Sequence, residues 1–343
     1  MKLSQVFRAA ALATVAFGAG AARADAVEDF YGSHDITLVV SAAPAGGADI
    51  YARAFAPVFA KHMPGRPNVI VTNVPGASGL TAGSQLQSQT EPDGTTFTLL
   101  QSNNLYIPLI KKGQVPFDPR EVDWLGSLSR ERHVLVTWKT SGLKTFQDVL
   151  DAEEPVIIGA TTLNQINGTL PELMRQALPD VPIKIVTGYQ GTGEILLAMQ
   201  RGEVAARSQS VTSLFAGSEA KYLETGELIP LLQLTRMGDP KLDGVPLVTD
   251  FVPPEIASNV FDFVFLPVAA SRPFAVPKGV PEDRLAAMRK AFEDAAADPE
   301  FAEAMAKLNS ETELLTGQEV ADIVTRVYQT PDDTLDMFRE FLN

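Results

Sequence analysis

Apolar residues along the chain alternate between two spacings, and this alternation predicts an α/β fold. Residues 36–43 form a short apolar run rich in β-branched side chains, which is typical of a buried strand. Residues 50–59 instead place apolar side chains three and four positions apart, as on one face of a helix. The same succession of strand, loop and helix recurs along the chain. Such a repeated order predicts largely parallel sheets covered by helices.

The same spacings predict the remaining elements. Further strands are expected at 68–74, 95–101, 134–138, 155–160, 183–187, 204–208, 229–234 and 260–266. Further helices are expected at 80–89, 145–150, 165–178, 194–201, 281–298, 300–308, 317–328 and 331–341. Residues 238–259 are rich in Pro, Gly and Asp and are interpreted as a long connection. A chain of this length favours two domains over one.

Two loops of small residues follow predicted strands and are candidate anion sites. Residues 44–49 read Pro-Ala-Gly-Gly-Ala-Asp, and residues 75–79 read Pro-Gly-Ala-Ser-Gly. A predicted helix follows each loop, and the first N–H groups and positive dipole end of a helix attract an anion. Ordinary helix-start chemistry explains either loop alone. Because ligands of open α/β sheets lie at the carboxyl ends of the strands, the two loops together favour a ligand site.

The first 24 residues are typical of a secretory signal peptide. Lys2 and Arg8 give a positive start, residues 9–17 are apolar, and Ala22-Arg23-Ala24 forms a small-x-small cleavage site. Cleavage is expected before Asp25, which predicts a periplasmic protein. A membrane anchor is disfavoured because the apolar stretch is too short to span a bilayer. A lipoprotein is excluded because the chain has no cysteine for lipid attachment.

Charge and composition narrow the range of partners. The whole chain has a formal charge of −14, and removal of residues 1–24 leaves 25 Lys+Arg against 42 Asp+Glu, a charge of −17. Such an acidic chain argues against nucleic acid or an anionic membrane surface as a partner. Capture of an anion would therefore depend on local dipoles. The lack of cysteine excludes disulfides, thiolate nucleophiles and Cys-based metal sites.

The chain offers no convincing catalytic or metal-binding pattern, which favours binding over catalysis. Residues 188–193 have the spacing G-x-x-G-x-G, and Glu194 stands where a phosphate-binding loop requires lysine. Ser208 and Ser210 lack the glycine-flanked elbow of serine hydrolases. Three scattered histidines without metal-ligand spacing are each predicted to be surface or packing residues: His34, His62 and His133. No metal and no cofactor are expected.

Several motifs carry a family resemblance over the whole mature chain. The two most specific are Pro-Ala-Gly-Gly-Ala-Asp-Ile-Tyr-Ala-Arg at 44–53 and Val-Thr-Asn-Val-Pro-Gly-Ala-Ser-Gly at 71–79. Supporting matches lie at 91–94, 188–191 and 201–204. With these motifs the chain resembles the extracytoplasmic solute receptors of the tripartite tricarboxylate transporter family, often called Bug proteins.

The resemblance implies a type II periplasmic-binding-protein fold, in which two α/β lobes close on a ligand in the cleft between them. In that fold the chain crosses between the lobes twice, and the crossings are placed near 130–140 and 250–262. We therefore expect a discontinuous lobe 1 of residues 25–135 and 260–343, and a lobe 2 of residues 136–259.

The resemblance also implies the binding mode. In the family, backbone N–H groups and ordered waters at the first two loops hold the ligand carboxylate, which corresponds to residues 45–49 and 76–79 here. The opposite lobe would supply loops near 161–164, 188–192 and 208–212. The expected ligand-binding residues are Ala45, Gly46, Gly47, Ala48, Asp49, Gly76, Ala77, Ser78, Gly79, Ser102, Asn103, Thr161, Thr162, Asn164, Gln190, Ser208 and Ser210.

The second lobe departs from the family pattern in three places. The loop at 161–165 reads Thr-Thr-Leu-Asn-Gln, where a Gly/Ser-rich loop is usual. Gln190 stands where lysine is common. Residues 207–210 read Arg-Ser-Gln-Ser, where an acidic or aromatic residue is usual. This lobe is expected to read the variable end of the ligand.

The expected protein is a monomeric receptor, without enzyme activity, that captures a small organic mono-, di- or tricarboxylate. It would deliver this ligand to the membrane permease subunits of a tripartite tricarboxylate transporter. Two alternatives stay open from the sequence. One is an exported α/β hydrolase acting on a carboxylated substrate, which would need a nucleophile or a metal. The other is a sensor subunit that presents its ligand to a signalling kinase.

Overall fold

The computed structural model describes residues 26–44, 47–129, 131–163, 165–216, 219–236, 238–254, 261–308 and 312–342. The predicted signal peptide at 1–24 and its cleavage site lie outside these residues. Among the helices in the described ranges, none is both long enough and apolar enough to cross a membrane.

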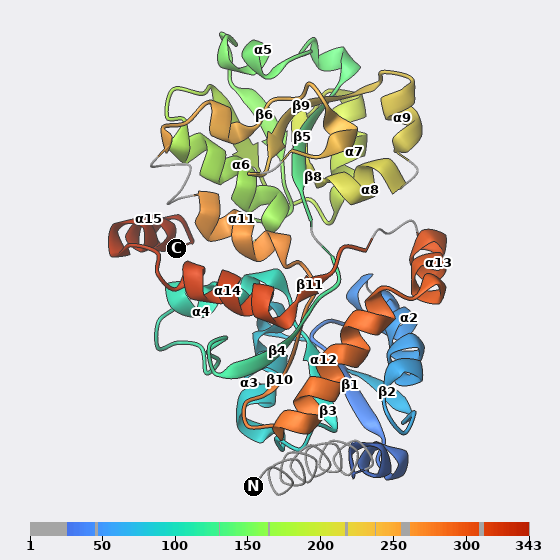
Figure 1. The fold of residues 1–343 in the computed structure, drawn as a ribbon. Coiled ribbons are helices and arrows are strands. Elements are labelled where there is room, and N and C mark those ends of the chain that lie inside the picture. Colours follow the sequence, from blue (N-terminus) through green and yellow to red (C-terminus); the bar gives the residue numbers. More distant parts are fainter. Residues whose placement is uncertain are drawn as a thin grey trace, which may run out of the picture.

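Two α/β lobes are visible in Figure 1, and each is built around its own sheet. The sheet of the first lobe has the strand order β11-β4-β10-β3-β1-β2. Strand β1 pairs in parallel with β2 and β3, whereas β10 and β11 pair antiparallel with their neighbours. The strands are β1 (Ile36–Val40), β2 (Val69–Asn73), β3 (Thr96–Leu99), β4 (Val122–Ser127), β10 (Pro273–Pro277) and β11 (Leu315–Thr316).

The sheet of the second lobe has the strand order β7-β6-β8-β5-β9. Strand β6 pairs in parallel with β7 and β8, and β5 pairs antiparallel with β8 and β9. The strands are β5 (His133–Trp138), β6 (Val156–Gly159), β7 (Ile183–Val186), β8 (Ala206–Ser210) and β9 (Leu228–Leu234).

Helices cover both sheets (Figure 1). The first part of the chain contributes α2 (Gly47–His62), α3 (Leu80–Gln89) and α4 (Ile107–Ile110). The second lobe contributes α5 (Phe146–Leu150), α6 (Ile166–Ala177), α7 (Thr192–Arg201), α8 (Val211–Ala216) and α9 (Ala220–Glu224). The last part contributes α11 (Asp262–Ala269), α12 (Glu282–Ala296), α13 (Pro299–Lys307), α14 (Gly317–Val327) and α15 (Asp332–Leu342). Short 3₁₀ turns are η1 (Ala77–Gly79), η2 (Ser102–Leu105), η3 (Lys139–Ser141), η4 (Pro240–Leu242) and η5 (Val248–Asp250).

An aromatic core joins the two halves of the first lobe. Phe55 of α2 lies 5.2–5.3 Å, between ring centroids, from three phenylalanines of the C-terminal part: Phe274, Phe292 and Phe301. All four rings are fully buried. Burial of each ring contributes about 1.5–3 kcal/mol, and the edge-to-face contacts add to that. This core therefore attaches β10, α12 and α13 to the N-terminal strands, although the whole second lobe separates them in the sequence.

The strand predicted at 260–266 is wrong, because residues 262–269 form helix α11. The run from Phe261 to Phe265 is buried on every side. A short apolar run of this kind has no periodicity that separates a buried strand from a buried helix. Helix α11 lies between the two lobes (Figure 1), and its Phe263 contacts Tyr106 and Phe338. The helix thus belongs to a core that spans both lobes.

Both sheets are mixed, whereas the sequence predicted largely parallel sheets. Strands β4, β10 and β11 were missed, and the antiparallel pairs all involve β5, β10 or β11. The chain passes from the first sheet to the second between β4 and β5, and it returns between β9 and β10. A strand that enters a sheet from the other lobe runs opposite to the strands that were built by local crossovers. The mixed pairing follows from these two crossings.

A buried carboxylate joins α2 to α13 and makes stability depend on pH. Asp298 caps α13 by accepting from the Glu300 N–H at 2.9 Å, and it also contacts Lys61 at 2.8 Å and His62 at 2.7 Å. The Lys61 ammonium, the Glu300 N–H and the His62 ring hold the pKa of Asp298 well below its usual range. A depressed pKa stabilises the folded state above the pKa of an unfolded aspartate, about 4, and this stabilisation disappears as the pH falls below that value.

We predict that Asp298→Asn reduces the loss of stability on acidification between about pH 7 and about pH 3. The urea-unfolding midpoint at each pH measures this. Asp294→Asn is the matched control, because Asp294 pairs with the exposed Lys290 on the surface of α12. An identical pH dependence for Asp298→Asn and the unmodified protein would contradict the prediction.

Candidate ligand-binding site

The carboxyl ends of β1, β2 and β3 meet at one edge of the first sheet and carry the two predicted loops. The backbone hydrogen bonds between the strands continue past the strand ends. The Ser41 N–H donates to the Leu99 carbonyl, and the Val74 N–H donates to the Val40 carbonyl. Helix α2 then begins at Gly47, two residues before the predicted start, and η1 leads into α3. Ala45 and Gly46 of the first loop lie outside the described residues. The helix N-terminus and the second loop are therefore brought to the same edge.

The second loop has an unusual backbone. Gly76, Ala77, Ser78 and Gly79 have φ angles of 131°, 46°, 54° and 91°. Residues other than glycine rarely adopt a left-handed conformation, and doing so at two successive positions stores strain. Strain of this kind is concentrated at binding and active sites. The second loop therefore carries two successive non-glycine residues in a strained conformation.

Amide side chains that follow β3 hold this loop in place. Asn103 and Asn104 both donate to the Ser78 carbonyl, at 3.2 Å and 2.9 Å. Asn104 also accepts from the backbone N–H of Gln101. Asn103 thus contacts the second loop, whereas Ser102 of the same 3₁₀ turn is half-buried beside it. These bonds fix the Ser78 carbonyl, and within the loop the Gly79 N–H donates to the Gly76 carbonyl at 2.9 Å.

Gly79 is required by the close approach of three chain segments. A Cβ at this position would lie 2.7 Å from Asn104 Oδ1 and 3.2 Å from Ser41 Oγ. The Ser41 hydroxyl is buried and has no hydrogen-bond partner among the described residues. A buried polar group without a partner is rare in proteins and marks a place where a ligand or water completes the bonding. The second loop, the end of β1 and the turn after β3 thus surround the buried Ser41 hydroxyl.

Asp49 organises the first loop from inside α2. Its buried carboxylate accepts from Arg53 Nε and from Asn73 Nδ2, each at 3.0 Å. Asn73 also donates to the Ala42 carbonyl at 3.0 Å, so it ties the ends of β1 and β2 together. The Asp49 carboxylate therefore positions the loop. Gly47 is exposed at the helix start with open space around its Cα, and Ala48 packs against the core of the first lobe.

The second lobe carries a cavity of about 360 Å³ at the ends of β6 and β8. Two of the predicted ligand residues, Ser208 and Ser210, line it. The other lining residues come from the start of β5, from β8, and from around the starts of α6, α7, α8 and α9: Glu131, His133, Gln165, Ile166, Asn167, Thr192, Gln209, Ser213 and Glu219. Helix starts and strand ends thus converge on this cavity, as at the edge of the first sheet.

The remaining predicted residues of the second lobe have other positions. The Thr161 hydroxyl bonds Gln165 at 2.6 Å and Asn167 at 2.8 Å, so it orients two side chains that line the cavity. Thr162 and Gln190 are exposed, and neither lines the cavity. Asn164 lies outside the described residues.

Arg207, the cation noted in the sequence, is sequestered inside the second lobe. Its side chain is fully buried and bonds the Thr192 carbonyl, Gln209 and the Glu219 carboxylate. Burial lowers the pKa of Arg207, and the Glu219 carboxylate acts in the opposite direction. Arg207 therefore links β8 to the starts of α7 and α9, and it does not line the cavity.

His133 lines the second-lobe cavity, and its burial agrees with the packing role that was one of the two options predicted from the sequence. The side chain is buried, and neither ring nitrogen has a hydrogen-bond partner among the described residues. His133 Nε2 lies 3.6 Å from Glu131 Oε2. Burial raises the pKa of Glu131, but His133 and Arg272 outweigh burial, and the pKa lies below its usual range. Only the pairing of β5 with β8, which sets His133 beside Ser210, reveals its place.

The region between the lobes connects the two halves of the site. Tyr51, in the first turns of α2, donates to the Leu128 carbonyl at 2.7 Å. The Arg272 guanidinium lies 4.5 Å from the centre of the Tyr51 ring, and its charge acts on Glu131. Ser271 N–H donates to the Ser129 carbonyl, so the two crossings lie side by side. Arg272 therefore lies between Tyr51 of α2 and Glu131, which lines the second-lobe cavity.

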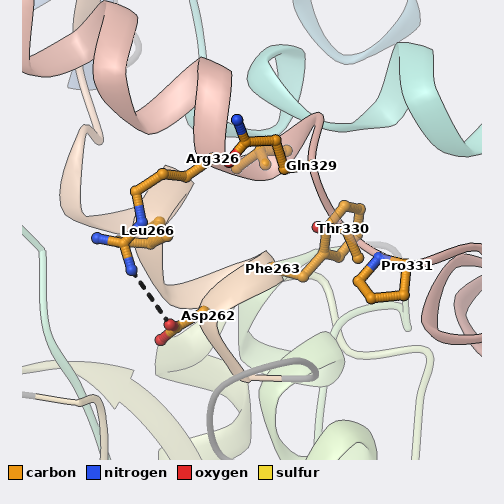
Figure 2. A pocket seen from close by; sticks show the side chains of 8 residues that line it. Asp262, Phe263, Leu266, Arg326, Gln329, Thr330 and Pro331 are labelled. Carbon is orange, nitrogen blue, oxygen red and sulfur yellow. Dashed lines mark hydrogen bonds and ion pairs between the residues drawn. The ribbon is translucent and has the colours of Figure 1, made fainter.

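Two further cavities lie along α11 and α14 and contain none of the predicted ligand residues. Figure 2 shows the smaller, of about 130 Å³, beside the ion pair between Arg326 and Asp262. The larger, of about 410 Å³, has an apolar floor that includes Phe265 and Ile323. In the described part of the chain, no cluster of three or more His, Asp or Glu side chains is placed to hold a metal.

The chain forms two α/β lobes, and the two segments that connect them lie side by side. This arrangement is that of a two-lobe solute-binding protein. The sequence model of the tripartite tricarboxylate transporter family receptor matches residues 52–330, and the chain belongs to this family. It is a receptor family, so the hydrolase alternative does not apply.

Known proteins agree with this assignment. The chain is 26% identical over 319 residues to the "UPF0065 protein in gbd 5'region" of Cupriavidus necator, covering 91% of this chain and 89% of that protein. A TctC solute binding protein from Polaromonas superposes with a TM-score of 0.70 at 19% identity, covering 91% of this chain and 99% of that chain. MatC from Rhodopseudomonas palustris with bound malate superposes with a TM-score of 0.60 at 17% identity, covering 88% and 99%.

We predict that Gly79→Ala lowers the free energy of unfolding by about 1–3 kcal/mol, because the new Cβ meets Asn104 in a backbone that already disfavours it. Gly142→Ala is the matched control, since Gly142 has a similar φ of 84° and open space around its Cα. Urea unfolding measures both. Equal losses in the two variants would mean that the contacts around Gly79 contribute nothing.

We predict that Arg207→Met lowers the free energy of unfolding by about 3 kcal/mol, because it leaves the Glu219 carboxylate and the Thr192 carbonyl without their partner. Arg201→Met, which removes an exposed ion pair with Glu203, is the control and should change little. The double variant Arg207→Met/Glu219→Gln should recover part of the loss. An Arg207→Met variant as stable as the control would contradict the buried link.

Proposed function

We propose that this receptor captures a small organic carboxylate in the periplasm and delivers it to the permease subunits of a tripartite tricarboxylate transporter. The observation that carries the proposal is the edge of the first sheet, where the strained loop at 76–79 adjoins the start of α2. In the proposed division, lobe 1 comprises residues 25–135 and 260–343, and lobe 2 comprises residues 136–259. The signal peptide at 1–24 would direct export.

The carboxylate would bind at the first lobe through backbone N–H groups. The proposed binding positions are Ala45, Gly46, Gly47 and Ala48 of the first loop, and Gly76, Ala77 and Ser78 of the second. Gly79, whose N–H donates to the Gly76 carbonyl, would shape the second loop around the ligand. An anion at a helix start gains about 0.3–1 kcal/mol at an exposed site and up to about 2 kcal/mol when partly buried. Each hydrogen bond to the charged group adds about 1.5–3 kcal/mol. Part of this gain is offset by the freedom that ligand and side chains lose on binding. We therefore expect a dissociation constant in the micromolar range, which corresponds to a binding free energy of about −8 kcal/mol.

The Arg272 side chain would add its positive charge to the attraction that the backbone N–H groups and the helix start exert on the carboxylate. Its Nε is buried without a hydrogen-bond partner among the described residues, and its guanidinium is stacked on Tyr51 beside the start of α2. The mature chain is strongly acidic, so its overall field repels an anion. A positive side chain close to the helix start offsets this repulsion locally. The malate bound to MatC, a protein of the same fold, supports a carboxylate as the ligand class.

Transport would follow from closure of the lobes. A ligand that touches both lobes favours the closed arrangement through its differential affinity for that arrangement. The hinge contacts between Tyr51 and Leu128 and between Ser271 and Ser129 lie where closure would be transmitted. We propose that the closed monomer docks on the permease subunits.

We predict that the mature protein binds carboxylates in isothermal titration calorimetry with dissociation constants around the micromolar range. The probes are mono-, di- and tricarboxylic acids, and the controls are the primary amides of the same acids. The amides should bind at least about tenfold more weakly, because they cannot form charge-assisted hydrogen bonds. Binding of a sugar or of a cation, without binding of any carboxylate, would overturn the proposed function.

A further inference from the structure

The cavity of the second lobe has the size and position of a subsite for the far end of a ligand. It has a volume of about 360 Å³ and is lined by strand ends and by the starts of α6 and α7. Glu131, which lines it, also feels the charge of Arg272 on the first-lobe side of the hinge. A small molecule anchored at the start of α2 would therefore extend toward this cavity.

Buried polar atoms point to a ligand here. Ser208 Oγ and His133 Nδ1 have no hydrogen-bond partner among the described residues, His133 Nε2 faces Glu131 Oε2 at 3.6 Å, and both side chains line the cavity. Ser208 is 0% exposed and His133 is 3% exposed. Nearly all buried polar atoms in proteins are hydrogen-bonded, and each exception calls for a partner. The hydroxyl and the ring can each donate or accept one hydrogen bond to a ligand.

The charges around the cavity decide what kind of ligand group fits. Its charged lining residues are the acidic Glu131 and Glu219, and neither a lysine nor an arginine is among the lining residues. Arg207 is close by, but its terminal nitrogens are engaged by Thr192, Gln209 and Glu219. Arg132 pairs with Asp239 and Glu313. The charge of Glu219 is offset by Arg207, so Glu131 is the acidic charge that a second carboxylate would meet in this partly desolvated site, where like charges repel.

We propose that this cavity binds the far end of the ligand as an uncharged or positively charged hydrogen-bonding group, so that the physiological ligand is a monocarboxylate. A hydroxyl, amide or ammonium group meets the Ser208 hydroxyl, the His133 ring and the acidic side chains. This inference rests on the proposed function, because the first lobe is taken to hold the single carboxylate. It separates this chain from MatC, whose bound malate is a dicarboxylate.

Calorimetry on matched ligands tests the inference. In four-, five- and six-carbon series, the mature protein is titrated with the ω-hydroxy acid, the ω-amino acid, the monoamide of the diacid, the diacid itself and the plain fatty acid. In at least one series, a hydroxy, amino or amide acid should bind at least about tenfold more tightly than the diacid. Diacids that bind as tightly as every polar monoacid would overturn the inference and leave the proposed function standing. If no acid binds, the proposed function fails, and the inference fails with it.

Variants then locate the effect in the cavity. Ser208→Ala should weaken binding of the best polar monoacid at least about fivefold and leave the plain fatty acid unchanged, because only the polar end loses a partner. Glu131→Gln should improve binding of the diacid relative to the polar monoacid. Ser88→Ala, on the exposed face of α3, is the control and should change neither. If Ser208→Ala weakens binding of the polar monoacid and of the fatty acid equally, the far end of the ligand does not lie in this cavity. The same follows if Glu131→Gln fails to improve binding of the diacid.

Discussion

The aromatic core of the first lobe links residues that lie on opposite sides of the second lobe in the sequence. Phe55 of α2 packs against Phe274 of β10 and against rings of α12 and α13. Because this core requires the C-terminal segment to return, the chain has to cross between the lobes twice. The two crossings then lie side by side, joined by the bond from Ser271 to Ser129. The hinge, and with it the meeting of the two polar strand-end regions, is a consequence of burying these rings.

The two lobes differ in the charged groups that face the region between them. This difference would suit a ligand with one carboxylate end and one end without a negative charge. On the first-lobe side are a helix start, the strained loop at 76–79 and the stacked guanidinium of Arg272. On the second-lobe side is Glu131, while Arg207 and Glu219 offset each other's charge inside the lobe. The net charge of the chain is negative, so attraction of an anion has to come from local dipoles and individual side chains.

Much of the fold could be predicted from local pattern. Helix α3 was predicted with its observed bounds, and the repeated strand-loop-helix order located most other elements within a few residues. The motifs in the loops indicated the family, and the match of the family model over residues 52–330 confirms it. Errors occurred where periodicity carries no information, as in the buried run that forms α11. Strand β10 was missed as well, because its partners β3 and β4 are distant in sequence.

The sequence by itself determined which segments form strands and helices and which loops carry small residues, because spacing and turn chemistry act over a few neighbouring positions. Only the tertiary structure decided which side chains share a site. His133 looked like an isolated histidine, yet its pairing with Ser210 sets it in a polar cavity. In the sequence Arg207 was only a departure from the family pattern, whereas in the structure Glu219, from a different segment of the lobe, holds it in the interior. Such roles depend on burial and on partners across strands, which no local pattern of residues encodes.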